Sequence, residues 1–321
     1  MDEAGRSREF RSQVIPRYAR RTRQVDEAIL GAYLAGANTR RIRKVLEPLL
    51  GAEHLSKSAV PRVAARLKGQ FGQWSERDLA EERYGTLFLD AIHLKVRLAR
   101  RVVSVPVLAA LGAWPRTGPS GWWRWSWPSP RRRPAGRGSW RAWCAGGLPR
   151  PVLILSDGHL GLAKAIAAWP RAQVQRCTLH KWRNLVKHCP RHAHRELKRD
   201  TDRIVYASSG MAAREAYQAF LTKWRTLCPA VARSLEEAGE QLLTFYTFPQ
   251  AMWKALRTTN SIENLNREFR RRTKTQTSFS TEEAAVTLLW GLVAFGQIEL
   301  RRICGYTHIT ALLAAPEEVA A

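Results

Sequence analysis

A segment between Ala113 and Gly147 limits what the whole chain can fold into, because it cannot supply an ordinary hydrophobic core. It uses only Ala, Cys, Gly, Pro, Arg, Ser, Thr and Trp, and it holds seven of the 13 tryptophans. It has no Leu, Ile, Val or Phe, and it follows neither a strand period nor a helix period. By composition it is typical of a disordered linker, or of a nucleic-acid arm whose tryptophans stack on bases. The core must therefore come from the sequence on either side.

The flanking sequence alternates strands with helices. Residues 86–96 and 101–112 are rich in branched and apolar side chains and predict two adjacent strands. Residues 152–155 predict a buried strand that leads through a turn into a helix, and residues 173–180 predict one more short strand. A mostly helical stretch follows, from about residue 182 to 248. Strand–loop–helix units of this kind are typical of an α/β fold.

The first 80 residues have a different, all-helical pattern. Residues 1–80 predict three short helices, each with one apolar face. Gly51 ends the second helix, and Pro61 is acceptable only in the first turn of the third. Helix, glycine turn and capped basic helix are the layout of a helix-turn-helix, although a short helical hairpin without DNA binding has the same pattern. The candidate DNA contacts are Lys57, Arg62 and Arg66.

The charge of the chain points to a polyanionic partner. Lys and Arg outnumber Asp and Glu by 53 to 27, which gives a net charge of +26. Removing the seven arginines of residues 113–147 still leaves +19, so nucleic acid is the expected partner. No apolar run is long enough to predict a membrane span, and five scattered cysteines do not predict a disulfide framework. We expect a soluble, cytoplasmic protein.

Three acidic residues lie inside or beside apolar sequence. Asp90 falls within a predicted strand, Asp157 follows another, and Glu263 comes early in a helix with one apolar face. Three carboxylates on a basic protein can hold Mg²⁺ or Mn²⁺ for the hydrolysis or transfer of phosphodiesters. Two simpler interpretations stay open, since Asp157 could only shape a turn and Asn260 with Glu263 fits a capping box. The helix of Glu263 also carries basic candidates for DNA binding, namely Arg267, Arg271 and Lys274.

Four motifs together resemble one protein family. They are LFLDAIHLKVR (87–97), ILSDGHLGLAKAI (154–166), QRCTLHKWRNL (175–185) and LRTTNSIENLNREFRRRTK (256–274). In this order they resemble the Mutator-type transposases of bacterial insertion sequences. The resemblance implies a ribonuclease H-like catalytic domain with a helical insertion, whose acidic triad is Asp90, Asp157 and Glu263 and whose cofactor is Mg²⁺ or Mn²⁺. It also implies a C-x-x-H motif, which Cys177 and His180 match.

The resemblance also predicts how the chain is divided. The expected parts are a helical DNA-binding region (1–80), the first part of the catalytic core (81–185), a helical insertion (186–250), the last part of the core (251–306) and a tail (307–321). The family pattern resumes at Leu148 with normal spacing between the two aspartates. We therefore favour the interpretation that residues 113–147 are translated out of frame, between two compensating frameshifts in a GC-rich gene. The tryptophan codon, TGG, arises easily when a GC-rich coding sequence is read in a neighbouring frame. The chain also starts part-way into the family pattern, which predicts a missing N-terminal portion.

Cys177 and His180 allow three interpretations. With Cys189 and His192 they would form a four-ligand zinc site. They could instead organise the active site or contact DNA, and Cys177 could simply pack in the core. We favour the second interpretation, because Cys189 and His192 lie outside the family motif.

The function that the resemblance implies is that of a DNA transposase. We expect metal-dependent strand cleavage and strand transfer at the ends of the element, by a homo-oligomer on DNA in the bacterial cytoplasm or nucleoid. The alternative is a catalytically inactive, DNA-binding remnant of such an enzyme. A third possibility is a zinc-dependent nucleic-acid binder.

Overall fold

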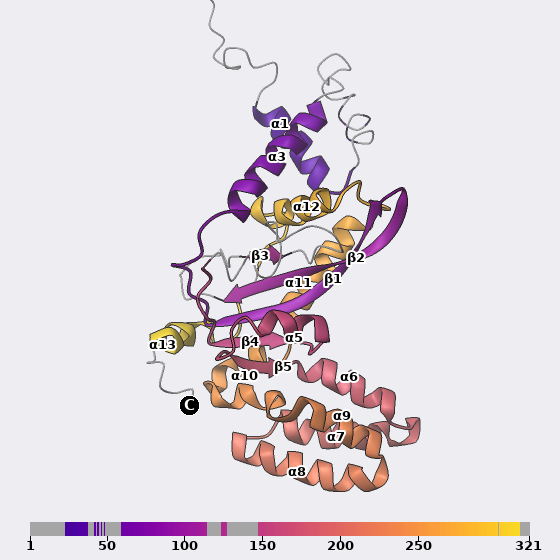
Figure 1. The fold of residues 1–321 in the computed structure, drawn as a ribbon, viewed down its shortest axis with the longest axis vertical. Helices are drawn as coiled ribbons and strands as arrows, with labels where there is room; N and C mark the ends of the chain where they lie inside the picture. Colours follow the sequence, from indigo (N-terminus) through magenta and orange to yellow (C-terminus); the bar gives the residue numbers. More distant parts are fainter. Residues whose placement is uncertain are drawn as a thin grey trace, which may run out of the picture.

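The computed structural model gives an α/β fold built on one five-stranded mixed sheet with helices on both faces (Figure 1). It describes residues 23–37, 42, 44, 46, 48, 59–113, 123–126, 147–300 and 302–314. The strands are β1 (Thr86–Leu98), β2 (Arg101–Ala113), β3 (Trp123–Ser126), β4 (Leu153–Ser156) and β5 (Gln173–Arg176).

The helices are α1 (Arg23–Leu34), α3 (Ala59–Ser75), α5 (Leu160–Ile166), α6 (Thr178–His188), α7 (His194–Val205), α8 (Gly210–Leu227), α9 (Pro229–Ala238), α10 (Gln250–Leu256), α11 (Asn260–Thr273), α12 (Glu282–Ala294) and α13 (Ile309–Ala314). Four short 3-10 turns lie at Arg191–Ala193, Gly239–Leu242, Thr244–Thr247 and Tyr306–His308. The helical character predicted for residues 182–248 is confirmed.

The strands are arranged in the order β3-β2-β1-β4-β5. β1 and β2 form the predicted pair of adjacent strands, joined by Ala99 and Arg100, which both have positive φ as a two-residue hairpin turn requires. β4 runs parallel to β1, and β5 runs parallel to β4. The sheet thus has an antiparallel half and a parallel half that meet at β1.

The expectation that the tryptophan-rich segment contains no regular structure is wrong for residues 123–126. The segment lacks a strand period, yet residues 123–126 form β3, which pairs antiparallel with β2. Strand pairing is made by backbone groups, so the open edge of β2 can accept a strand whose side chains do not alternate. Residues 114–122 and 127–146 lie outside the described residues.

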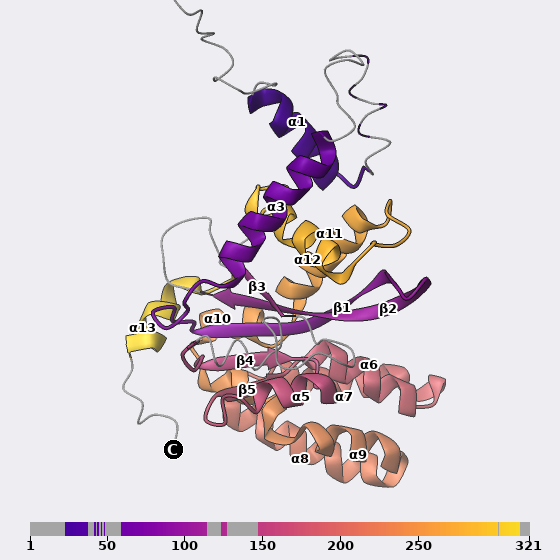
Figure 2. The ribbon, with the colours of Figure 1, turned by 45° about the horizontal axis from the view of Figure 1, so that its top comes forward.

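The alternation of side chains along β1 decides which helices cover each face of the sheet. Phe88, Ile92 and Val96 belong to a core cluster shared with α11 and α12, whereas Leu87 and Leu89 point to the opposite face and pack with α5. Figure 2 shows α11 and α12 on one side of the β1–β2 hairpin and α5 on the other. The even-numbered residues of β1, such as Phe88, therefore face α11.

The N-terminal helices share the core of the sheet. Leu34 of α1 and Leu67 of α3 are buried in the same cluster as the face of the sheet under α12. A Cβ added at Gly291 of α12 would lie 2.8 Å from Leu34, so this glycine allows the close approach of the helices. Pro61 lies in the first turn of α3, as predicted. Lys57 lies outside the described residues.

Helices α6 to α9 enclose a second apolar cluster, with Trp224 and Leu235 at 1% and 0% exposure. Gln175 of β5 joins this cluster to the sheet, because its buried amide donates to the Leu242 carbonyl at 3.0 Å and accepts from the Phe245 amide at 2.7 Å. The buried ammonium of Lys181 donates to the Ser234 carbonyl at 2.7 Å. The bonds of Gln175 hold the second cluster beside the parallel half of the sheet, and the bond of Lys181 joins α6 to α9.

Candidate active site

Asp90 lies within β1, at an even-numbered position on the face that α11 covers. Its Oδ2 accepts a hydrogen bond from Asn266 Nδ2 at 2.7 Å, and its Oδ1 accepts one from the Ala91 amide at 2.8 Å. Burial raises the pKa of Asp90; the two hydrogen bonds oppose this effect, and the nearby negative charge of Asp157 adds to it. The site therefore holds two neighbouring carboxylates in a partly desolvated setting.

Asp157 follows the last residue of β4, at the carboxyl end of a parallel strand. Its Oδ1 accepts a hydrogen bond from the His159 amide at 2.8 Å, so the residue does shape the predicted turn. Gly158 has φ +80, and a Cβ there would lie 2.0 Å from the Arg176 guanidinium, so only glycine fits. Turn formation is compatible with proximity to Asp90, whose pKa is raised by burial and further by the charge of Asp157.

Glu263 projects from the first turn of α11. Its Oε1 accepts a hydrogen bond from Thr259 Oγ1 at 2.8 Å and lies 3.6 Å from His180 Nδ1. Its Oε2 lies 4.0 Å from the Arg183 guanidinium. The capping-box interpretation is wrong, because Thr259 rather than Asn260 is the N-cap residue and its side chain bonds to Glu263 instead of capping the helix.

Cys177 and His180 connect the end of β5 to α11. The strand predicted over residues 173–180 ends at Arg176, and Cys177 is the N-cap of α6. The Cys177 sulfur accepts from the Thr259 amide at 3.4 Å and lies 3.3 Å from Thr259 Oγ1, whose one proton is directed to Glu263. No local pattern of residues predicts that Thr259 would link this motif to Glu263.

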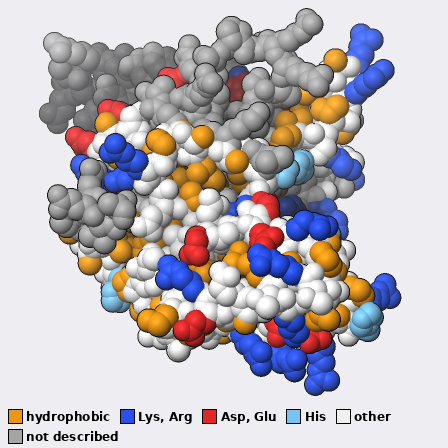
Figure 3. Space-filling view, turned by 60° about the horizontal axis from the view of Figure 1, so that its bottom comes forward, with side chains coloured by type: hydrophobic (Ala, Val, Ile, Leu, Met, Phe, Trp, Pro, Cys, Tyr) orange, Lys and Arg blue, Asp and Glu red, His pale blue; other side chains and the backbone are white. Residues whose placement is uncertain are grey.

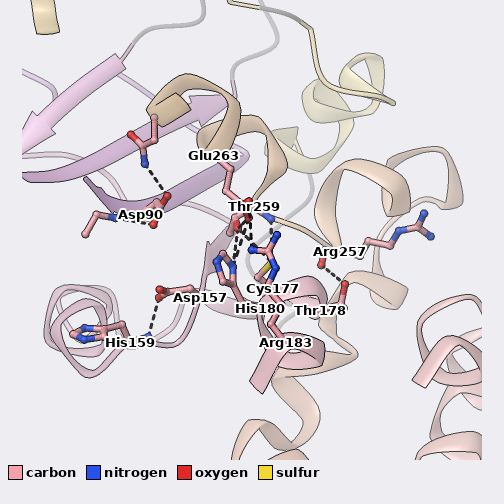
Figure 4. Close-up of polar contacts among 12 residues, drawn as sticks. Asp90, Asp157, His159, Cys177, Thr178, His180, Arg183, Arg257, Thr259 and Glu263 are labelled. Atoms are coloured by element: carbon pink, nitrogen blue, oxygen red, sulfur yellow. Dashed lines mark hydrogen bonds and ion pairs between the residues drawn. The ribbon is translucent and has the colours of Figure 1, made fainter. Parts of the chain in front are cut away.

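The thiol and the imidazole perturb each other. Burial raises the pKa of Cys177, but hydrogen bonds with His180 and Thr259 outweigh burial and leave it lowered. The pKa of His180 is raised, chiefly by its hydrogen bond with Cys177 and further by the charges of Glu263 and Asp157, against the opposing effect of burial. Figure 4 shows His180 between Asp157 and Glu263, with Asp90 facing the same region.

Ligand atoms of Cys177, His180 and Glu263 lie within 4.8 Å of one another. The four-ligand zinc site is wrong, because Cys189 is the C-cap at the far end of α6. A helix of 11 residues separates the pairs by roughly 15 Å. His192 also lies beyond that end, so the structure does not bring the two pairs together.

The carboxylates fit a hard divalent cation. Within the described ranges, no Lys or Arg forms an ion pair with Asp90 or Asp157. Burial of Asp90 beside a second carboxylate disfavours its charge, and a cation would relieve this cost. Oxygen ligands are those that Mg²⁺ and Mn²⁺ prefer.

Asn266 is the site residue that sequence reasoning missed. It is fully buried on α11, one turn after Glu263, and it contacts Asp90 across 176 positions of the sequence. Among the residues that the structure describes, its Oδ1 has no hydrogen-bond partner. The one signal in the sequence was an amide residue on the same helix face as the apolar residues Ile262 and Phe269. This position predicts burial but does not identify the hydrogen-bond partner.

The predicted DNA contacts fall into two groups. Arg62 and Arg66 are exposed on α3, where Arg66 pairs with Asp26 at 3.5 Å. Arg267 and Arg271 are exposed on α11 and line a cavity of about 990 Å³, and Lys274 is exposed at the C-cap of the same helix. On the face shown in Figure 3, Lys and Arg side chains lie in separate groups with Asp and Glu between them.

None of the helices in the described part of the chain combines the length and apolar character that a membrane span requires.

Comparison with known proteins identifies the family. A family model described as Transposase, Mutator family, matches residues 4–116 and 142–298. The transposase for insertion sequence element IS406 of Burkholderia multivorans is 34% identical over 304 residues, which cover 90% of this chain and 74% of that protein. The transposase for ISRM5 of Rhizobium meliloti is 32% identical over 299 residues, covering 89% and 72%. The transposase for IS256 in transposon Tn4001 of Staphylococcus aureus is 28% identical over 287 residues, covering 87% and 72%.

The family match has a gap inside the tryptophan-rich segment. Residues 117–141 are left unmatched, although the match resumes at residue 142 and continues to residue 298. The matched ranges contain all four motifs that carried the resemblance. The chain therefore belongs to the Mutator family of transposases.

Proposed function

We propose that this chain is a DNA transposase that cleaves DNA strands at the ends of its insertion sequence and transfers them to target DNA. The observation that carries the proposal is the convergence of Asp90, Asp157 and Glu263 from β1, the end of β4 and α11 (Figure 4). The three carboxylates would hold Mg²⁺ or Mn²⁺, which supplies activation of the attacking oxygen and stabilisation of the leaving oxygen.

The sheet topology supports a ribonuclease H-like catalytic domain. The order β3-β2-β1-β4-β5, with three antiparallel strands followed by two parallel ones, agrees with the fold that the family resemblance implies. Asp90 lies on the central strand and Asp157 ends its parallel neighbour. Carboxyl ends of adjacent parallel strands are where α/β sheets place their sites.

Other side chains of the site fix the carboxylates. Asn266 orients Asp90 through its amide, and Thr259 orients Glu263 through its hydroxyl. His180, whose pKa is raised, presents positive charge near Glu263 and Asp157 when it is protonated. This charge favours the ionised carboxylates and would attract a DNA phosphate.

A second candidate is a DNA-binding remnant without catalytic activity. The observation that favours it is the unmatched stretch 117–141, where only residues 123–126 form a described strand. A sheet that lacks part of its third strand and the following helix would bury less apolar surface beside Asp90.

A cleavage assay separates the two candidates. The full chain is incubated with DNA from the ends of its own element, in Mg²⁺ or in EDTA. The transposase proposal predicts nicked or joined products in Mg²⁺ alone, and their loss in Asp90→Ala. Salt-sensitive DNA binding with no product in either buffer would support the remnant and contradict the enzyme.

A further inference from the structure

The cavity of about 990 Å³ forms an open groove between the second helical cluster and α11. Its walls come from α6, α7, α10, α11 and residues 297–300 and 302–304. Its cationic lining residues are Lys198, Lys254, Arg257, Arg267, Arg271, Arg272 and Arg302. Its acidic lining residues are only Asp202, Glu268 and Glu299. The groove is therefore markedly basic.

Several of these cations form no ion pair with a described carboxylate. Arg271 pairs with Glu268 at 2.8 Å, but Lys254, Arg257 and Arg267 form no ion pair with any carboxylate among the residues that the structure describes. Lys254 on α10 and Arg267 on α11 are both exposed, and they come before and after the loop that contains Arg257. Unpaired cations lining one groove fit the spaced phosphates of a nucleic-acid strand.

An exposed aromatic ring lies in the same groove. Tyr206, directly after α7, is 60% exposed, and the Arg257 guanidinium lies 4.3 Å from its ring centroid. The Arg257 carbonyl accepts hydrogen bonds from the Thr178 amide and hydroxyl, both at 2.9 Å, so the backbone of Arg257 is held against α6. An exposed ring beside a guanidinium is a platform on which a base can stack.

The platform lies next to the proposed catalytic site. Arg257 precedes Thr259 by two residues, and Thr259 bonds to both Cys177 and Glu263. Figure 4 shows Arg257 and Thr178 on one side of this group. Asn260 and Asn264, which flank Glu263 on α11, line the groove itself. The groove therefore runs along α11 beside the turn that carries Glu263, whose own side chain is not among the lining residues.

We propose that the groove binds a DNA strand with an unpaired base stacked on Tyr206 and with phosphates beside Lys254 and Arg267. This inference rests on the proposed transposase function, because it assigns the strand that lies beside the active site. An unpaired base is required, since the faces of paired bases are covered by their neighbours in a duplex. Stacking accepts any base, so the contact would not select sequence.

The test is equilibrium binding of the full chain to fluorescent oligonucleotides in EDTA, which excludes cleavage. One probe is a 12-nucleotide oligothymidine, and the other is an abasic oligomer of the same length. We expect Tyr206→Ala to weaken binding of oligothymidine by about 5- to 100-fold and to leave abasic binding unchanged. Tyr206→Phe keeps the ring and should retain binding. Met211→Ala, at a residue 72% exposed on α8, is the matched control for losing an exposed side chain.

Removing the cations of the groove should weaken DNA binding without regard to the bases. Lys254→Gln and Arg267→Gln should weaken both probes alike and lower the slope of log affinity against log salt by about 0.7 each. Arg233→Gln, an exposed arginine of α9 outside the groove, should change neither.

The outcomes separate this inference from the transposase proposal. The stacking platform would be overturned if Tyr206→Ala weakened the binding of both probes equally, or if it weakened the binding of neither. If the chain cleaves DNA in Mg²⁺ while Tyr206→Ala and Lys254→Gln bind as wild type does, the groove is wrong and the enzyme stands. If the base-dependent loss occurs in a chain that never cleaves, the groove stands and the catalytic proposal fails.

Discussion

Asn266 Nδ2 donates a hydrogen bond to Asp90 Oδ2 at 2.7 Å and thereby joins α11 to β1. Glu263 lies one helical turn earlier on α11, so this bond also fixes where the third carboxylate stands relative to the first. The active-site geometry therefore depends on a buried amide as well as on the acidic residues themselves.

Asp90→Asn should make the protein more stable while it removes activity. The folded-state pKa of Asp90 is raised, so the folded state favours the proton, and this preference is lost as pH rises above the ordinary value near 3.9. At pH 7 a neutral amide avoids the burial of charge, and the free Oδ1 of Asn266 can accept from it after an amide flip. We expect a gain of about 1 kcal/mol in the free energy of unfolding, measured in urea. A loss of stability at pH 7 would contradict the raised pKa.

Cys177→Ser should lower the pKa of His180. The hydrogen bond with Cys177 is the largest cause of the raised value, while Glu263 and Asp157 continue to raise it. The stabilisation from protonated His180 is present below about pH 6.5 and is lost as pH rises through the folded-state pKa. NMR titration of the imidazole signal measures the pKa of His180, and the His180→Gln variant assigns that signal. An unchanged pKa would show that the thiol does not act on the imidazole.

Thr259→Val should slow DNA cleavage more than it weakens DNA binding. Valine keeps the shape of threonine but loses the hydroxyl that bonds to Glu263 and lies 3.3 Å from the Cys177 sulfur. Misplacing one carboxylate should lower the single-turnover rate by about 10- to 100-fold. Thr259→Ser keeps the hydroxyl and should retain most of the rate, and a serine variant as slow as the valine variant would contradict the role assigned to the hydroxyl.

The nucleotide sequence that encodes residues 113–147 should contain a hidden strand and helix. We expect a neighbouring frame to encode an alternating apolar strand and then an amphipathic helix, as the unmatched stretch 117–141 suggests. A chain with that frame restored should unfold at a higher urea concentration, because it buries more apolar surface. No such pattern in any frame would favour a genuine linker.

The sequence was sufficient to predict most of the elements but not the contacts between them. Branched apolar runs predicted β1 and β2, and the structure confirms their pairing. The bonds of Asn266 and Thr259 join positions far apart in the chain, and no local pattern identifies such partners. The strand at residues 123–126 was missed because edge pairing depends on the backbone, which every sequence offers.

Metal binding tests the central claim that Asp90, Asp157 and Glu263 form one site. Electron paramagnetic resonance of Mn²⁺ titrated into the full chain measures the bound ion directly. Asp90→Asn, Asp157→Asn and Glu263→Gln should each weaken binding by at least about tenfold, because each removes a charged oxygen ligand. Glu215→Gln, an exposed carboxylate of α8, should bind as wild type does. Wild-type affinity in any of the three site variants would contradict the shared site.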